Sequence, residues 1–284
     1  MTRYAPYILT SIAMLAFAAN SVLGRMALGA GSIDATSYTA VRLGSGALML
    51  FVIHFASTRK VTASAFNLWS ALALFTYAWC FSISYLHVPT GTGALQLFAM
   101  VQLTMIGWSL FKGERPHMLA WIGIALAGAG LVYLLLPSVS TPPLGSSLLM
   151  MAAGVAWGAY SLLGRGNRDP LAATAWNFIG SLPLVAVVLL LIPHTVFVSP
   201  KGLALACLSG AVSSGIGYSI WYAALPHLTA LRASTVQLTV PVIASVGGAL
   251  LVGEGITLQL AVASVAVLGG VYLTIQSKFQ GRRP

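Results

Sequence analysis

Long apolar runs separated by short polar turns fill almost the whole chain of 284 residues. A helix needs about 20 residues to cross a hydrocarbon core of about 30 Å. The runs are continuously apolar and lack the alternation of barrel strands, which favours helices over a closed β-barrel. The predicted fold class is therefore an all-α membrane protein. Its ten predicted transmembrane helices lie near residues 7–28, 35–56, 66–86, 91–111, 117–136, 145–165, 171–192, 201–225, 231–252 and 256–276.

Composition strengthens this prediction and excludes a soluble domain. Hydrophobic residues make up 58% of the chain and charged residues only 6%, whereas soluble domains carry about 25% charged residues. The mean hydropathy is +0.91. With so little charge, most of the outer surface has to face lipid. Cys80 and Cys207 fall inside predicted spans, which favours buried thiols over a disulfide.

The net charge of +10 is distributed unevenly over the predicted loops. If the N-terminus is cytoplasmic, most of the basic residues lie on that side, namely Arg3, Arg59, Lys60, Lys112, Arg115, Arg165, Arg168, Arg232, Lys278, Arg282 and Arg283. The opposite side has only Arg25 and Lys201, and Arg42 lies within a span. This positive-inside distribution predicts that both termini are cytoplasmic. The charge thus indicates topology and contact with anionic lipid, and no nucleic-acid partner is expected.

An internal repeat divides the chain into two similar halves. Residues 16–25 (AFAANSVLGR) and 156–165 (AWGAYSLLGR) share six of ten positions. Three further matches follow in the same order: Tyr85 and Pro89 with Tyr222 and Pro226, Gly113-Glu114 with Gly253-Glu254, and Gly130 with Gly269. The predicted repeats are residues 1–140 and 141–284, with five spans each. Because five is odd, the second repeat is inverted in the membrane, which is typical of alternating-access transporters.

On these residues the chain resembles the drug/metabolite transporter superfamily and its EamA family. The resemblance rests on the first-helix pattern, on Arg42 early in the second helix, and on Gly-Glu before the last helix of each half. Within the family the chain is most similar to the YddG-type exporters of aromatic and other amino acids. The resemblance implies a ten-helix basket, two inverted five-helix repeats around a central cavity, in a bacterial inner membrane. Since one chain contains both repeats, a monomer is expected.

Two predicted spans carry a stripe of small and polar residues along one helical face. The stripes are Gly93, Gln96, Met100, Thr104 and Gly107 in the fourth span, and Ser234, Gln237, Pro241, Ser245 and Gly248 in the ninth. Two interpretations remain open. Small residues allow helices to pack closely, or the stripes line a cavity in which Gln96 and Gln237 bind a zwitterion through their amides. Pro241 lacks an N–H and is either a hinge or a packed kink.

A second candidate set lies in the middle of the first and third spans and of their counterparts in the second half. Its members are Asn20, Tyr77, Trp157, Tyr160, Ser214 and Tyr218. Aromatic rings enclose apolar or aromatic solutes, and their polar tips orient them. The alternative interpretation is that the aromatic residues anchor the membrane interface.

Charged residues within the spans are scarce. Arg42 either meets a substrate carboxylate or has a structural role, extending outward or holding backbone carbonyls. The acids Asp34, Glu114, Asp169 and Glu254 all fall at span ends or in loops. Without an acid inside the membrane, cation/proton antiport is disfavoured and neutral or zwitterionic solutes are favoured. The two Gly-Glu pairs are interpreted as helix ends that bind neighbouring backbone.

Enzyme chemistry finds little support in the sequence. The chain has no H-E-x-x-H, no G-x-S-x-G with suitably placed partners and no Gly-rich phosphate loop, so no catalytic residue, cofactor or metal is expected. The leading prediction is an exporter of small metabolites, above all aromatic and other neutral amino acids. The alternatives are a multidrug or amphiphile exporter of the same superfamily and a non-transport membrane subunit or sensor. Phosphorylated substrates are disfavoured because they would require several basic residues in the cavity.

Overall fold

The computed structural model describes residues 5–58, 66–113, 117–136, 142–164, 167–191, 196–228 and 236–280. In the first half the helices are α1 (Ala5–Leu28), α2 (Ala35–Thr58), α3 (Leu68–Ser84), α4 (Thr90–Phe111) and α5 (Met118–Leu135). The second half begins with α6 (Leu144–Leu163) and α7 (Pro170–Leu191). A continuous helical run follows, made of α8 (Pro200–Cys207), the π-helical η2 (Leu208–Ile216), α9 (Gly217–Ala224) and η3 (Leu225–His227). The last helices are α11 (Thr239–Gly247), which continues into the π-helical η4 (Gly248–Val252), and α12 (Leu258–Gln280).

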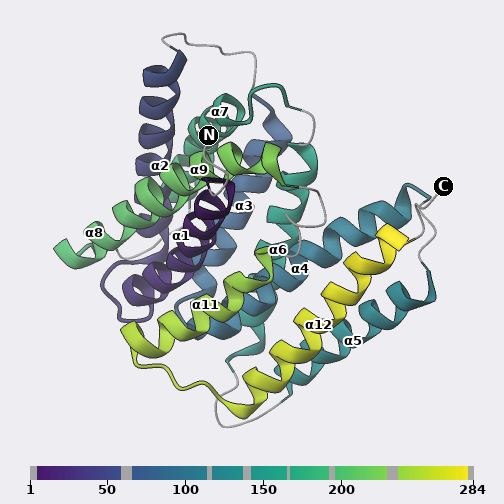
Figure 1. Cartoon of the computed structure of the whole chain (residues 1–284). Helices are drawn as coiled ribbons and strands as arrows, with labels where there is room; N and C mark the ends of the chain where they lie inside the picture. Colours follow the sequence, from purple (N-terminus) through teal and green to yellow (C-terminus); the bar gives the residue numbers. More distant parts are fainter. Residues whose placement is uncertain are drawn as a thin grey trace.

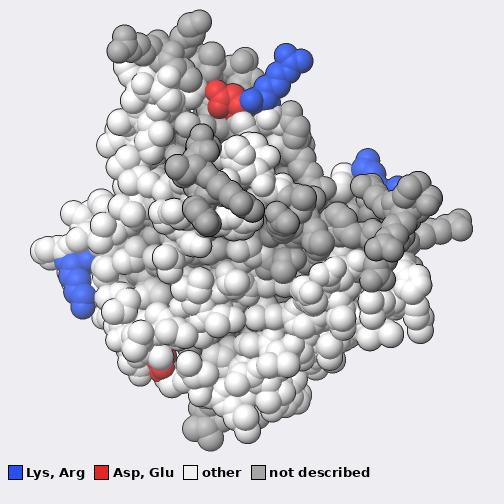
Figure 2. All heavy atoms as spheres, in the orientation of Figure 1, with Lys and Arg blue, Asp and Glu red and all other residues white. Residues whose placement is uncertain are grey.

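These helices have the apolar surface of a membrane protein. Within the described residues, eight helical segments are long and apolar enough to cross a bilayer, and the segments Leu68–Ser84 and Thr239–Val252 are shorter apolar helices. Large side chains such as Leu190, Leu250 and Val265 are more than three-quarters exposed, as expected for a surface that faces lipid. Figure 2 shows a largely uncharged face whose described charged side chains lie near its margins. The predicted all-α membrane fold is confirmed, and the count of ten spans stays a prediction.

Helices of the first half pack mainly against helices of the second half. The closest such pairs are α5 with α12, α3 with α6, α4 with α6, and α2 with α7 and η2. Helix α1 packs along the run from α8 to α9 and against α11. In Figure 1, α5 and α12 lie side by side at one edge of the molecule. The two halves therefore interlock, and the core lies between them.

Hydrogen bonds show which helix ends lie together. At one end of the molecule, Arg25 near the end of α1 bonds to the Tyr85 carbonyl after α3. The Ser84 hydroxyl donates to the carbonyl of Ser146, at the start of α6. Because α6 starts here, it finishes with Gly164 at the opposite end. We refer to these as the Arg25 end and the Gly164 end.

Candidate functional site

Two adjoining cavities lie among the helices and share walls formed by Phe17, Trp157 and Tyr218. The larger cavity has a volume of about 440 Å³. The smaller pocket has a volume of only about 20 Å³, enough for one water-sized group. Besides the shared walls, the smaller pocket is lined by Asn20, Ser21, Tyr77, Phe81, Leu97, Phe98, Ser213 and Ser214.

The larger cavity opens at the Gly164 end. Its lining includes Gly164 after α6, Asn167 before α7 and Leu225 in η3. Asn167 and Leu225 are exposed, so the cavity reaches the surface there. Its other walls are Met105, Tyr160, Ser161, Pro170, Ala173, Thr174, Asn177, Trp221, Tyr222 and Gln237. The smaller pocket lies deeper, toward the Arg25 end.

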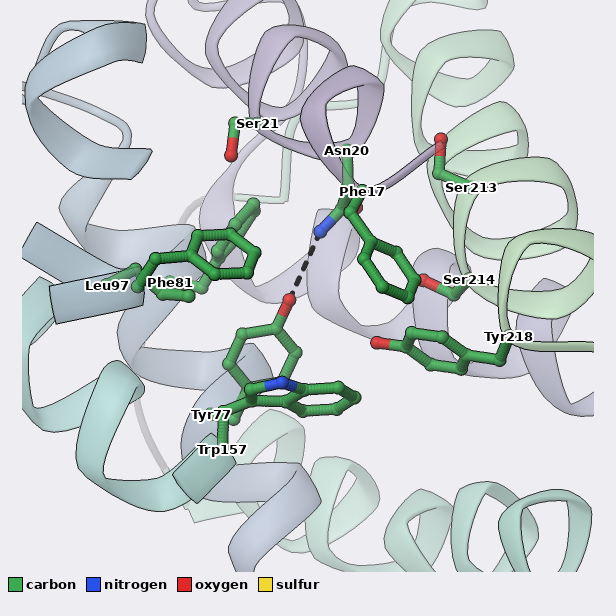
Figure 3. A pocket seen from close by; sticks show the side chains of 11 residues that line it. Phe17, Asn20, Ser21, Tyr77, Phe81, Leu97, Trp157, Ser213, Ser214 and Tyr218 are labelled. Atoms are coloured by element: carbon green, nitrogen blue, oxygen red, sulfur yellow. Dashed lines mark hydrogen bonds between the residues drawn. The ribbon is translucent and has the colours of Figure 1, made fainter. Parts of the chain in front are cut away.

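An aromatic cluster separates the larger cavity from the smaller pocket. Trp157 and Tyr160 lie three residues apart on one face of α6, and their rings stack with centroids 5.2 Å apart. On its other side Trp157 stacks on Tyr218 at 5.2 Å and lies 4.9 Å from Tyr77. Figure 3 shows the Trp157 ring just below Tyr77, with Tyr218 and Phe17 to its right. Such walls suit a flat or apolar group of a solute.

A hydrogen-bond network runs behind the smaller pocket and links four elements. The Asn20 amide on α1 donates to the Tyr77 hydroxyl on α3 at 3.1 Å, the bond drawn in Figure 3. Arg42 on α2 donates to the same hydroxyl at 2.8 Å. Ser209 on η2 donates to the side-chain oxygen Oδ1 of Asn20 at 2.6 Å and accepts from the Tyr38 hydroxyl at 2.8 Å. The network satisfies the buried Asn20 amide and fixes the orientation of Tyr77.

Arg42 is buried in the core, with only 1% of its surface exposed. Its guanidinium lies 4.5 Å from the ring centroid of Phe81 and 5.0 Å from that of Tyr77. The Nε and Nη1 atoms make no hydrogen bond within the described ranges. The side chain therefore does not extend outward to the membrane surface, which was one of the structural interpretations of the sequence.

A group of hydroxyls on α6, α7 and α9 forms a polar wall of the larger cavity. Tyr160 donates to Thr174 at 3.2 Å, and Thr174 lies 2.9 Å from the Tyr222 hydroxyl. Thr174 and Asn177 are buried and line the cavity, although neither was among the residues predicted from the sequence. The sequence does contain a sign of them, because two polar residues three positions apart in an apolar span share one helical face.

The two polar stripes are used differently. Gln237 lines the larger cavity, whereas Gln96 and Met100 line neither cavity. Met100 lies against α6, where a Cβ on Gly154 would approach the Met100 Cβ to 2.7 Å. Gln96 is fully buried, and its amide atoms have no hydrogen-bond partner among the described residues. Helix packing thus explains Met100, and the substrate role of Gln96 stays a prediction.

Pro241 lies in the first turn of α11, which starts at Thr239. Val236 and Gln237 are helical, and a turn at Leu238 separates them from α11. Proline provides no N–H for the carbonyl four residues earlier, so its position agrees with an interruption there. The hinge role of Pro241 stays a prediction. Ser234, the first member of this stripe, lies outside the described residues.

The Arg25 end is closed by an ion pair. The Arg25 Nε donates to Glu254 Oε1 at 2.8 Å, and Arg25 Nη1 donates to the carbonyls of Tyr85 and Leu86 at 3.0 and 2.9 Å. Glu254 Oε2 accepts the Thr90 N–H at 2.7 Å. Gly253, with a φ of +77°, ends η4 in the left-handed conformation that glycine adopts readily. These bonds join the end of α1, the turn from α3 to α4 and the loop before α12.

Comparison with known proteins places the chain in a family. The model of the EamA-like transporter family matches residues 144–276. An uncharacterized protein of Pseudomonas aeruginosa is 50% identical over 268 residues, which is 94% of this chain and 93% of that protein. The chain belongs to the EamA-like transporter family. This confirms the family resemblance on which the sequence analysis relied.

Other relatives of this chain have functional names. The threonine/homoserine exporter RhtA of Escherichia coli K12 is 27% identical over 261 residues, covering 87% of this chain and 84% of RhtA. A probable amino-acid metabolite efflux pump of Salmonella typhimurium is 26% identical over 214 residues, covering 70% and 72%. A solved crystal structure superposes with a TM-score of 0.65 at 19% identity, covering 96% of this chain and 99% of that one. This last likeness shows a shared fold.

Proposed function

We propose that the chain is a ten-span inner-membrane carrier that exports small metabolites, above all aromatic and other neutral amino acids, by alternating access. The observation that carries the proposal is the cavity of about 440 Å³, open at the Gly164 end, with the Arg25–Glu254 pair closing the opposite end. Small-molecule sites typically occupy about 300–1,000 Å³. A central cavity open to one side only is what an alternating-access carrier requires.

In the proposed exporter, the opening at the Gly164 end is the one through which the solute enters. Helix α1 begins at the end opposite Arg25, and α12 starts after Glu254 at the Arg25 end. The start of α1 and the end of α12 therefore lie on the side where the cavity opens. With the termini cytoplasmic, as the basic loops predict, the cavity receives its solute from the cytoplasm.

The pairing of helices supports two inverted repeats, residues 1–140 and 141–284. Helix α5 packs against α12, α2 against α7, and α4 against α11, and each pair joins the same position of the two repeats. Helix α6 packs against α3 as α1 packs against the α8–α9 run. A twofold axis in the membrane plane would produce such reciprocal contacts. One chain then completes the basket, which favours a monomer.

The lining supports neutral amino acids as substrates. The described residues that line the two cavities include no acidic and no basic side chain. Cationic drugs would need an acidic side chain in the lining, and phosphorylated metabolites would need several basic ones. The aromatic walls suit apolar side chains, and the hydroxyls suit amino and carboxylate groups. Amino-acid transport also agrees with the names of the RhtA and efflux-pump relatives. The same aromatic walls favour an uncharged amphiphile as the second candidate substrate.

Transport by the purified protein in liposomes tests the proposal. The vesicles are loaded in turn with labelled phenylalanine, methionine, threonine and a phosphorylated sugar, with and without a pH gradient. We expect amino-acid flux, no sugar-phosphate flux, and a gradient response only if proton movement is coupled. Gln237→Ala should reduce the flux because Gln237 lines the cavity. Absence of flux for every amino acid would contradict the proposal and direct the search to amphiphiles.

A further inference from the structure

The Tyr77 hydroxyl has one unused hydrogen-bonding group, its proton. A phenolic oxygen accepts through two lone pairs and donates one proton. Asn20 and Arg42 both donate to this oxygen, at 3.1 and 2.8 Å. No described residue accepts the Tyr77 proton, and Tyr77 lines the smaller pocket. The proton is therefore available to a solute that enters this pocket.

Arg42 places a positive charge directly behind Tyr77. The described acids are bonded elsewhere: Asp34 to the Ser37 N–H, Asp169 to the Ala172 N–H, and Glu254 to Arg25. No described carboxylate forms an ion pair with Arg42. A charge at the centre of a membrane helix costs about 2.5–3.5 kcal/mol on insertion scales. In a medium of low dielectric constant, such a charge strongly favours an anionic group nearby.

A second hydroxyl donor faces the same space. Tyr218 lines both cavities, and its hydroxyl makes no hydrogen bond within the described part of the chain. Figure 3 shows the Tyr218 hydroxyl pointing toward the middle of the pocket, where the Tyr77 hydroxyl meets Asn20. A carboxylate has two oxygens, each of which accepts hydrogen bonds. Two phenolic donors and a buried positive charge match that group.

We infer that Tyr77 and Tyr218 together bind the carboxylate of the transported solute. Asn20 orients the Tyr77 hydroxyl, and the positive charge of Arg42 beside it favours an anionic group. One carboxylate oxygen then occupies the smaller pocket, which has room for one water-sized group, and the remainder of the solute extends past Trp157 into the larger cavity. Tyr77 and Tyr218 contact the solute, and Arg42 is a positioning residue that acts through Tyr77. The inference rests on the proposed carrier function and names the group that the site recognises.

Matched ligands separate recognition of a carboxylate from general binding. Tryptophan fluorescence measures the Kd of phenylalanine, of phenylalaninamide, and of 3-phenylpropionate, which lacks the amino group. We expect the wild-type protein to bind phenylalanine at least about tenfold more tightly than its amide, because hydrogen bonds to a charged acceptor are about twice as strong. Tyr77→Phe should raise the Kd of both carboxylates about tenfold. It should raise that of the amide less than about threefold.

Tyr160→Phe is the matched control, because it removes another cavity hydroxyl that bonds to Thr174 rather than to Arg42. We expect it to change the Kd of phenylalanine and of its amide by the same factor. Arg42→Gln, if it folds, should repeat the selective loss seen in Tyr77→Phe. The melting temperature of each variant checks that folding is preserved.

The outcomes distinguish this inference from the carrier proposal. If the wild-type protein transports amino acids but Tyr77→Phe weakens acid and amide equally, the carboxylate site is wrong and the carrier function stands. If 3-phenylpropionate binds in a Tyr77-dependent way while no amino acid is transported, the carboxylate site stands and the amino-acid function is wrong. If no carboxylate binds, both are wrong.

Discussion

At the scale of single residues, Trp157 is the side chain on which the site depends most. Its ring centroid lies 4.9–5.2 Å from those of Tyr77, Tyr160 and Tyr218. We expect Trp157→Ala to raise the KM for phenylalanine about tenfold, since aromatic pairs contribute about 0.5–1.5 kcal/mol beyond the area they bury. Counterflow in liposomes measures the change. Trp121→Ala, half-exposed on α5, should leave KM unchanged, and an equal rise in both variants would contradict a specific role for Trp157.

Some of the candidate residues chosen from the sequence meet in one pocket, and others lie outside both cavities. Asn20, Tyr77, Trp157 and Tyr218 were selected from matched mid-span positions, and the structure brings them to one pocket. Gln96 followed an equally clear spacing yet lies outside both cavities. Periodicity shows which residues share a face, but which neighbour covers that face depends on how the helices are arranged. For that reason a packing stripe and a cavity stripe look alike in the sequence.

At the scale of helices, the contact between α5 and α12 depends on two facing glycines. A Cβ on Gly270 would meet the Gly123 carbonyl and the Ala127 backbone nitrogen, whereas a Cβ on its neighbour Gly269 would meet nothing within 4 Å. We expect Gly270→Ala to lower Tm by about 3–10 °C, since overpacking costs about 1–3 kcal/mol and each kcal/mol shifts Tm by about 2–4 °C. Gly269→Ala should leave Tm nearly unchanged. Equal Tm values for the two variants would show that α5 and α12 separate without cost.

The positions of most helices were predictable because the bilayer fixes the length of an apolar run. The first span was predicted at 7–28 and α1 is Ala5–Leu28; the sixth was predicted at 145–165 and α6 is Leu144–Leu163. The π-helical segments η2 and η4 were not predicted. Their extra residue per turn leaves the apolar composition unchanged, so a hydropathy pattern does not register it.

At the scale of the whole molecule, sequence alone does not determine which end is open. In the proposed carrier, two inverted repeats would present similar residues to both sides, and the same chain would form both states of the alternating-access cycle. What distinguishes this state is the set of bonds from Arg25 and Glu254 at one end. The free energy of that closure, set against the alternative closure at the Gly164 end, decides which state predominates.

Whether the Arg25–Glu254 pair holds the Arg25 end closed can be tested directly. Glu254→Gln keeps an acceptor for the Thr90 N–H but removes the charge that pairs with Arg25, a loss of about 1.5–3 kcal/mol for a charge-assisted bond. Ser21, which lines the smaller pocket one turn before Arg25, reports the opening when replaced by cysteine in a chain lacking Cys80 and Cys207. An impermeant maleimide applied to the Arg25 side should label Ser21→Cys about tenfold faster in the Glu254→Gln variant.

The charge-loss control is Lys201→Gln, which removes an exposed charge near the start of α8 without touching the Arg25–Glu254 pair. Labelling of Ser21→Cys should stay at the wild-type rate in this variant. Because opening one end of a carrier requires closing the other, Glu254→Gln should also slow labelling from the Gly164 side. Faster labelling from both sides would instead show that the pair only holds the helix ends together. Unchanged labelling from both sides would show that other contacts close this end.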